Sequence, residues 1–407
     1  MADTGEQFEA SASALGYLFQ FAKALHICIE QWMGADMDWN VAVEAADDIE
    51  IQRGPDRRLI QLKQRAEGVR MTDLSEDLWK TLRIWAEAAK SSRIALAETK
   101  LFLLTTAELP EGSAAFCLQP RSSQHRDEDH ALHLLREARK ASKAKKGSLP
   151  KCFAAFDDLD LGDRPLQRSL ISRIEVLGGT QDITEVRDAL KGLAAFAVGH
   201  DAAKAFLARL EGWFYDRVIE QMQVPGGSPV TGIEFDERLS DLQRQFRYDN
   251  LPIDHDIYDM TSDASHSADQ RFVRQLKLIG VGDERVGLAV RDYVRAFTQR
   301  SRWSAENLLR AGELGKYERR LVEEWQSRFA EMAEDLGFEA TEEEKKKEAK
   351  LIYRWVDREA RFPIRADCDE VFVTKGSYHI LADELKVGWH PDFSARLMEL
   401  LEPARAR

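Results

Sequence analysis

The chain has 407 residues, which is enough for two or three domains of ordinary size. Its 58 basic and 71 acidic residues give a formal net charge of −13, which excludes a surface built as a whole to coat nucleic acid but not a local basic groove. No run approaches the roughly 18 apolar residues of a membrane-spanning helix, and the N-terminal residues lack the pattern of a secretory signal, so we expect no membrane partner and a cytoplasmic location.

The first 110 residues combine helical and strand patterns. Apolar residues recur at helical spacing from Phe8 to Met33, whereas β-branched residues alternate with others between Trp39 and Ile51. Gly54-Pro-Asp56 is typical of a turn between two strands. The predicted order is a helix (8–33), two strands (39–51), a strand (58–63), a helix (74–89) and a strand (100–106).

After Ala131 nearly every segment has helical periodicity, and the segment 225–229 is the clearest loop. A short strand is predicted at Val371-Phe-Val373. The predicted fold class is therefore an α/β N-terminal domain, with a small mixed sheet flanked by helices, followed by a mainly α-helical region. We place the boundaries at 1–150, 151–250 and 251–407.

One cluster of polar residues falls on the predicted strands. Because side chains alternate along a strand, Gln61 and Lys63 share one face of their strand, and a hairpin around the turn brings Asp48 towards them. Asp47 has the opposite parity, so we prefer Asp48. Glu44 is an outer member of the cluster, and so is Gln20, on the first helix.

These residue types suit phosphodiester hydrolysis. Mg²⁺ or Mn²⁺ prefers hard oxygen ligands, which Asp48, Glu44 and the weaker amide ligand Gln61 would provide. A lysine beside the ion, here Lys63, can orient or deprotonate the attacking water, and Gln20 could reach that water. The competing interpretation of Gln61-Leu-Lys63 is an ordinary amphipathic edge strand. The same three-residue pattern recurs at Gln275-Leu-Lys277, where helical spacing suggests no chemistry.

The N-terminal motifs resemble the PD-(D/E)xK nuclease superfamily, in the variant with Gln-x-Lys. More closely, they resemble the endonuclease domain of CD-NTase-associated anti-phage effectors, on four segments: Gly16-Tyr-Leu-Phe-Gln20, Val43-Glu-Ala-Ala-Asp-Asp-Ile49, Leu59-Ile-Gln-Leu-Lys63 and Asp73-Leu-Ser-Glu-Asp-Leu-Trp79. The resemblance implies that 1–150 is an endonuclease domain with Asp48, Gln61 and Lys63 in its active site.

A second resemblance lies downstream, to the C-terminal domain of ABC-three-component defence proteins. It rests on Phe272-Val-Arg-Gln-Leu276, Arg295-Ala-Phe-Thr-Gln-Arg-Ser-Arg-Trp303, Gly312-Glu-Leu-Gly-Lys-Tyr-Glu318 and Glu323-Glu-Trp325. Together the two resemble the nuclease effector of Lamassu-type systems. That family implies DNA as substrate, an SMC-like ATPase and a small accessory subunit as partners, and self-association of the nuclease on activation. The sequence has neither GxxxxGK[ST] nor GxGxxG, so any ATPase is expected to be a partner.

Two basic regions leave alternatives open. The stretch 136–151 predicts either DNA-backbone contacts or a solvated helix that leads into a linker; its candidate DNA-binding residues are Lys140, Lys143, Lys145 and Lys146. The second region borders a predicted core stripe of Val290, Val294 and Phe297. Arg and Trp are enriched in protein–protein interfaces. We interpret this region as a partner-docking face rather than a DNA face, formed by Arg295, Arg300, Arg302 and Trp303.

The four cysteines form no Cys-x-x-Cys pair, so we expect no structural zinc site. The leading hypothesis is a Mg²⁺- or Mn²⁺-dependent DNA endonuclease effector held and activated by an ATPase complex. The alternative is a non-catalytic adaptor that bridges an SMC-like ATPase to DNA or to another effector.

Overall fold

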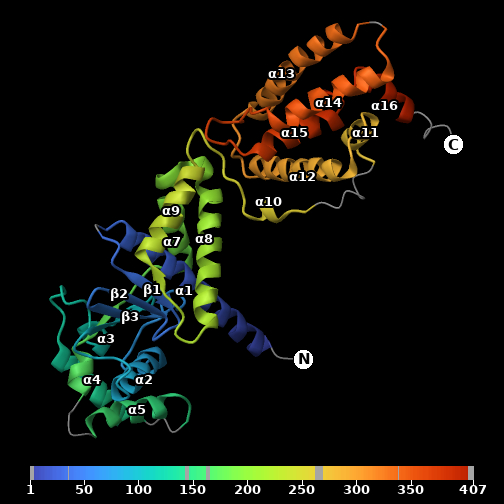
Figure 1. Ribbon diagram of the computed structural model, residues 1–407. Helices are drawn as coiled ribbons and strands as arrows, with labels where there is room; N and C mark the ends of the chain where they lie inside the picture. The colour runs from blue at the N-terminus through green and yellow to red at the C-terminus, as the bar shows by residue number, and fades with distance from the viewer. Residues whose placement is uncertain are drawn as a thin grey trace. The chain divides into compact units, whose positions relative to one another are not determined.

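The computed structural model describes residues 4–34, 36–142, 146–161, 166–261, 269–337 and 339–401. The chain divides into two compact units, and each is described by itself (Figure 1). The first unit comprises 1–196 and 207–240, and the second comprises 197–206 and 241–407. None of the described helices is long and apolar enough to span a bilayer.

The first unit is built on a six-stranded mixed sheet with the order β5-β4-β3-β2-β1-β6. Strands β1, β2, β3 and β6 pair antiparallel, whereas β3/β4 and β4/β5 pair parallel. The strands are β1 (Asn40–Val43), β2 (Ile49–Arg53), β3 (Asp56–Lys63), β4 (Thr99–Thr105), β5 (Ile174–Leu177) and β6 (Val230–Thr231).

Helices flank this sheet, which confirms the predicted fold class (Figure 1). Helix α1 packs against β1, and α2 packs against α5. The helices up to the end of the first unit are α1 (Thr4–Trp32), α2 (Glu76–Lys90), α3 (Ala114–Cys117), α4 (Glu128–Ala141), α5 (Leu149–Asp157), α6 (Gln167–Ile171), α7 (Ile183–Val198), α8 (His200–Gln223) and α9 (Gly232–Gln245), with a short 3-10 helix at Asp158–Asp160. The division between the units falls within α7, α8 and α9.

A large apolar core fixes α2 against the sheet. Leu59 of β3 and Leu101 and Leu103 of β4 are fully buried in it, together with the nearly inaccessible rings of Trp79 and Trp85 from α2. Burial of each such side chain contributes roughly 1.5–3 kcal/mol relative to exposure. The core therefore holds the carboxyl ends of β3 and β4, where Lys63 lies, at a defined position relative to α2.

The predicted order of the first 110 residues is confirmed: α1, β1, β2, β3, α2 and β4. The hairpin is also confirmed, because β2 and β3 pair antiparallel around Gly54, which has a positive φ of 52°. Two strands come from a region that looked helical in the sequence. Strand β5 lies beside β4, and the two residues of β6 pair with β1. A boundary at residue 150 would separate both strands from their sheet.

The second unit is helical. Its helix α15 packs against α11, α12, α13 and α14, and nearly all of its side chains are buried. The predicted strand at 371–373 is wrong, because these residues form the first turn of α15. Phe372 and Val373 pack into a core that covers most of the helix, whereas Val371 is exposed. The helices are α10 (Asp256–Asp259), α11 (Arg271–Leu278), α12 (Asp283–Ala305), α13 (Glu313–Leu336), α14 (Glu342–Arg358), α15 (Val371–Asp383) and α16 (Phe393–Leu401).

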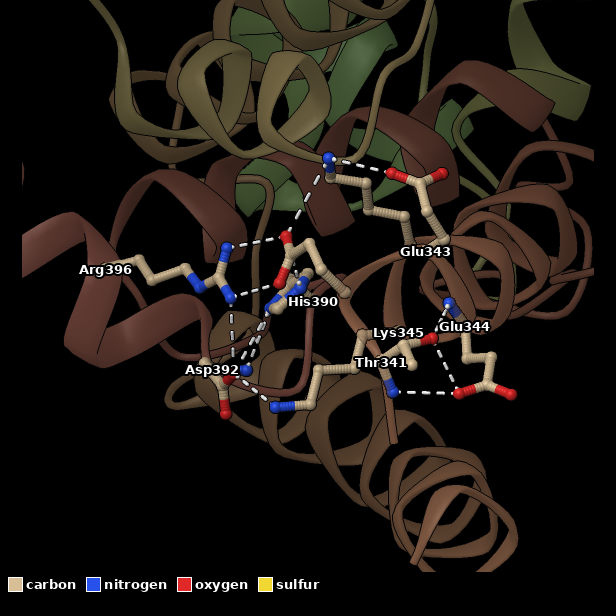
Figure 2. Close-up of polar contacts among 9 residues, drawn as sticks. Thr341, Glu343, Glu344, Lys345, His390, Asp392 and Arg396 are labelled. Carbon is tan, nitrogen blue, oxygen red and sulfur yellow. Dashed lines mark hydrogen bonds and ion pairs between the residues drawn. The ribbon is translucent and has the colours of Figure 1, made fainter. Parts of the chain in front are cut away.

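A network of charged groups fixes the start of α14 to α16 (Figure 2). Thr341 and Glu344 form a capping box at the first turn of α14. Glu342 binds both terminal nitrogens of Arg396 on α16, and its Oε1 lies 3.5 Å from Nε2 of the buried His390. Lys345 donates to Asp392 at 3.0 Å. The N-terminus of α14 is therefore held by its own cap, by Arg396 of α16 and by the loop before α16.

Candidate active site

The polar residues of the first unit converge at the turn between β1 and β2. This turn covers residues 44–48, and the backbone N–H of Glu44 donates to the carbonyl oxygen of Asp48 at 3.0 Å. Glu44 has a φ of 53°, in the left-handed region, although it is not a glycine. Such a conformation costs on the order of 1–3 kcal/mol and recurs at functional sites. The fold holds a carboxylate here at the expense of backbone strain.

Asp48 bridges the turn to β3. Its Oδ2 accepts a hydrogen bond from the backbone N–H of Leu62 at 2.7 Å, and the residue is 9% exposed. Ile49 pairs with Ile60, so the next step of the register places Asp48 opposite Gln61. Lys63 follows two residues later, on the same face of β3 as Gln61. The predicted proximity of these three residues therefore agrees with the strand register.

Asp47 links the backbone of Asp48 to α2. Its Oδ1 accepts from the backbone N–H of Asp48 at 3.0 Å, and its Oδ2 accepts from Nε1 of Trp85 on α2. Burial raises the pKa of Asp47 to about 6, an effect that the Trp85 hydrogen bond opposes. Strand parity alone disfavours Asp47 as a site residue. Its contribution depends on a tryptophan 38 residues away, which local spacing does not reveal.

A cavity of about 560 Å³ opens beside this turn. It brings together four of the five predicted site residues: Gln20 from α1, Glu44 and Asp48 from the turn, and Lys63 from the end of β3. The fifth, Gln61, is only 2% exposed and does not line the cavity. The remaining lining residues are Leu15, Gly16, Tyr17, Phe19, Leu62, Gln64, Arg65 and Ala66.

The charged side chains that line the cavity are two carboxylates, Glu44 and Asp48, and two cations, Lys63 and Arg65. Burial raises the pKa of Glu44, and the charge of Asp48 raises it further. A hydrogen bond from Gln20 and the charge of Lys63 act in the opposite direction. Glu44 and Asp48 therefore repel each other across the cavity, and a bound cation would relieve that repulsion.

The donor atoms fit a hard divalent cation. Among the described residues, no group of three or more His, Cys, Asp or Glu side chains is placed to hold a metal. The candidate set is instead Glu44, Asp48 and the amide of Gln61. Oε1 of Gln61 is buried and has no hydrogen-bond partner within the described part of the chain, and the same holds for Oε1 of Gln20. A buried, unpaired amide oxygen on the residue opposite Asp48 is a ligand of the kind that Mg²⁺ or Mn²⁺ accepts.

The predicted DNA-binding lysines lie only partly within the described residues. Lys140 is exposed on α4 and pairs with Glu137 at 2.9 Å, and Lys146 is exposed after the helix. Lys143 and Lys145 lie outside the described residues. The exposure of Lys140 and Lys146 is compatible with solvent and with DNA alike, so the role of this stretch stays a prediction.

The predicted docking face on α12 needs a correction at two positions. Trp303 is fully buried, and its Nε1 donates to the carbonyl oxygen of Pro252. Arg300 is 7% exposed and is bound by Ser377 and Glu318. Both side chains stabilise the second unit, because helical spacing turned them towards α15 and the 251–253 segment rather than towards solvent.

The other two members of that set are partly accessible. Arg302 pairs with Asp254 and Asp256, and Arg295 donates to the carbonyl oxygen of Tyr258. The predicted core stripe beside them also ends early, because Phe297 is 53% exposed. A docking role for Arg295 and Arg302 stays a prediction.

Comparison with known proteins identifies the second unit. Residues 272–397 match the model of C-terminal domain 7 of the ABC-three component (ABC-3C) systems. This range contains all the segments on which the downstream resemblance was based, so that resemblance is confirmed. No curated protein and no solved structure matches the chain. The chain therefore carries an ABC-3C C-terminal domain 7 and is a component of a three-component anti-phage defence system, which implies partner subunits.

Proposed function

We propose that the chain is the metal-dependent DNA endonuclease effector of its ABC-3C system. The observation that carries the proposal is the cavity that gathers Gln20, Glu44, Asp48 and Lys63 next to the unpaired amide oxygen of Gln61. The mixed sheet with flanking helices is compatible with the proposal, since Gln61 and Lys63 lie at the end of β3 and Asp48 lies directly before β2.

Each residue has a role that follows from its position. Asp48, Glu44 and Gln61 would hold Mg²⁺ or Mn²⁺, which when bound stabilises the charge that develops on the phosphate and lowers the pKa of water. Lys63 orients the attacking water and offsets negative charge in the cavity. Gln20 fixes the carboxylate of Glu44 by a hydrogen bond. Asp47 holds the backbone of Asp48 through Trp85 and is a positioning residue.

The ABC-3C domain supports the remainder of the proposal. An SMC-like ATPase and a small accessory subunit hold the effector through this helical unit, and activation proceeds by self-association of the nuclease. The absence of a phosphate-binding glycine loop from the sequence supports an ATPase in a separate subunit. Control by partners also suits the net charge of −13, which limits nonspecific attraction to host DNA.

One observation favours a second candidate, the non-catalytic adaptor. The third candidate ligand is an amide, and an amide oxygen binds a divalent cation more weakly than a carboxylate does. In that case the first unit would be a scaffold that bridges an SMC-like ATPase to DNA or to another effector.

Cleavage of plasmid and linear duplex DNA tests the proposal. Wild type, Lys63→Ala and Lys100→Ala are incubated with Mg²⁺ or Mn²⁺, each with and without the proteins encoded next to it. Lys100 is a matched control, since it lies on the neighbouring strand β4, pairs with Asp56 at 2.8 Å and does not line the cavity.

We expect Lys63→Ala to lower the cleavage rate by about 10²-fold or more, with an unchanged melting temperature. Lys100→Ala should cleave DNA at the rate of wild type. Absence of cleavage by folded wild type in the intact complex would support the adaptor instead. An unfolded Lys63→Ala variant would assign Lys63 to structure rather than to chemistry.

A further inference from the structure

Arg65 supplies the second positive charge of the cavity. The charged side chains that line it are Glu44, Asp48, Lys63 and Arg65. A phosphodiester that enters this space meets two carboxylates and two cations. Because Lys63 is assigned to the attacking water, Arg65 is the remaining lining cation, among the described residues, that can bind a phosphate oxygen.

The guanidinium of Arg65 is already held in one orientation. Its Nε donates to Oδ2 of Asp77 at 2.5 Å, and its Nη2 donates to the other carboxylate oxygen. Asp77 is 8% exposed and lies in the first turn of α2, where the helix dipole favours a carboxylate. The bidentate pair uses Nε and Nη2, so Nη1 takes no part in it, and the Arg65 side chain is 48% exposed.

The backbone of Arg65 is fixed as well. Its N–H donates to Oγ1 of Thr106 at 2.7 Å, and the same hydroxyl donates to the carbonyl oxygen of Arg65 at 2.8 Å. Thr106 follows β4 directly, and β4 pairs in parallel with β3. Arg65 is thus tied to β4 through its backbone and to α2 through its side chain, so little conformational entropy remains to be lost on binding.

From this arrangement we infer that Arg65 binds a backbone phosphate of the DNA substrate in the cavity, with Asp77 as its positioning residue. The inference rests on the proposed endonuclease function and adds to it the residue that seats the substrate. Guanidinium groups match the geometry of phosphate oxygens. The carboxylate of Asp77 binds Nε and Nη2 and limits rotation of the guanidinium, which leaves its Nη1 side for a phosphate oxygen.

Arg58 is a matched control for this role. It lies on β3, the strand that ends two residues before Arg65, and its Nε and Nη2 both donate to Oδ2 of Asp56. Its side chain is 36% exposed, but it does not line the cavity. An arginine that merely adds charge to the first unit would affect DNA binding equally at either position.

Binding of a fluorescent 30-base-pair duplex by the full chain measures the effect. Anisotropy is recorded with Ca²⁺ in place of Mg²⁺, over a range of salt concentrations. We expect Arg65→Ala to weaken binding by about tenfold or more, and to reduce the slope of log K against log salt by about 0.9, the value for one lost phosphate contact. Arg65→Lys should restore the salt slope but only part of the affinity, and Arg58→Ala should match wild type.

Stability controls accompany these variants, because Arg65→Ala leaves the buried carboxylate of Asp77 unpaired. The double variant Arg65→Ala/Asp77→Asn removes that charge, so it tests DNA binding if the single variant melts early. Asp77→Asn alone keeps the cation but loosens it, and we expect a several-fold rise in KM for cleavage by the assembled complex with a smaller change in kcat.

The outcomes separate the inference from the proposed function. Wild type that binds and cleaves DNA, with Arg65→Ala and Arg58→Ala equal in affinity and salt slope, would overturn the role of Arg65 and leave the endonuclease standing. Wild type that neither binds nor cleaves DNA in the complex would overturn both.

Discussion

At the residue scale, Glu44 is a candidate metal ligand in a strained backbone conformation. A φ of 53° is one that a glycine adopts freely and a glutamate does not. The residue also lies beside the like charge of Asp48, which raises its pKa in addition to burial. Both effects oppose folding, and both are consistent with a position retained for its carboxylate.

This conflict predicts that Glu44→Gly makes the protein more stable and less active. Relief of the left-handed strain and of the charge repulsion should raise the free energy of unfolding by about 1 kcal/mol. Loss of the carboxylate should lower cleavage by 10-fold or more. Urea denaturation and the plasmid assay measure the two effects.

Ser92→Gly is the control for the backbone effect. Ser92 has a φ of 57°, is exposed just after α2 and does not line the cavity. It should gain similar stability without loss of cleavage. If Glu44→Gly were less stable than wild type and fully active, the turn would be a structural feature only.

At the element scale, the elements that depend on local pattern were predicted and those that depend on distant pairing were not. Alternation from Trp39 to Ile51 and the turn at Gly54 give β1, β2 and β3 from neighbouring residues alone. Strand β6 has only two residues, and its partner β1 lies some 190 positions earlier in the chain. The sequence around residues 230–231 therefore cannot indicate that they form a strand.

The candidate site divides in the same way. Gln61 and Lys63 follow from strand parity, and Asp48 lies one residue before β2, where the hairpin register continues opposite Gln61. Asp47 and Arg65 instead depend on Trp85 and Asp77 of α2. Parity argued against Asp47 because it treated the residue as part of a strand, but the strand begins at Ile49. The burial of Trp303 could not be predicted for a related reason: it depends on the segment around Pro252, which lies some 50 residues earlier in the chain and covers this face of α12.

Packing between α12 and α15 gives a prediction for two glycines. A Cβ on Gly376 of α15 would lie 2.1 Å from the carbonyl oxygen of Asp292 and 2.4 Å from Cβ of Ala296, both on α12. Gly287 of α12 has no atom within 4 Å of its Cβ position. Since alanine favours a helix by about 1 kcal/mol over glycine, the two substitutions should have opposite signs.

We expect Gly287→Ala to stabilise the second unit by about 0.5–1 kcal/mol and Gly376→Ala to destabilise it by about 1–3 kcal/mol. Urea denaturation followed by tryptophan fluorescence measures both. Equal stability of the two variants would mean that α12 and α15 can move apart without loss.

At the scale of the whole molecule, the two units carry different titrating groups. His379 of α15 is 3% exposed, lies against the rings of Phe272 and Trp389, and has its pKa lowered to about 3 by burial. Burial also lowers the pKa of His390. When the second unit unfolds, both histidines regain their usual pKa near 6.5, so the unfolded state binds protons that the folded state excludes. For His379 this difference extends from pH 6.5 down to about 3.

Acid should therefore weaken the second unit, whereas divalent cations should strengthen the first. Between pH 7 and pH 5 we expect His379 alone to account for a loss of ~2 kcal/mol in the second unit. Mg²⁺ at 100 times its Kd should add about 2.7 kcal/mol to the first unit. Calorimetry of the full chain, with one transition for each unit, separates the two effects.

Two variants assign the transitions. Asp48→Ala should remove the response to Mg²⁺, and His379→Phe should reduce the acid response. A single transition that responds to both variables would show that the units unfold together, and a Mg²⁺ response that survives in Asp48→Ala would place the ion elsewhere.

The place of β6 in the sheet also determines when the first unit can be completed during translation. A nascent chain emerges from the ribosome N-terminus first, so the turn with Glu44 and Asp48 is made long before Val230 and Thr231, which close the sheet beside β1. Gln221, whose side chain bonds both the N–H and the carbonyl oxygen of Val43, also arrives late. A message truncated before codon 221 would therefore yield a product with the candidate site residues Glu44, Asp48 and Lys63 but without the strand and the amide that brace them, and such a product should be degraded faster than the full chain.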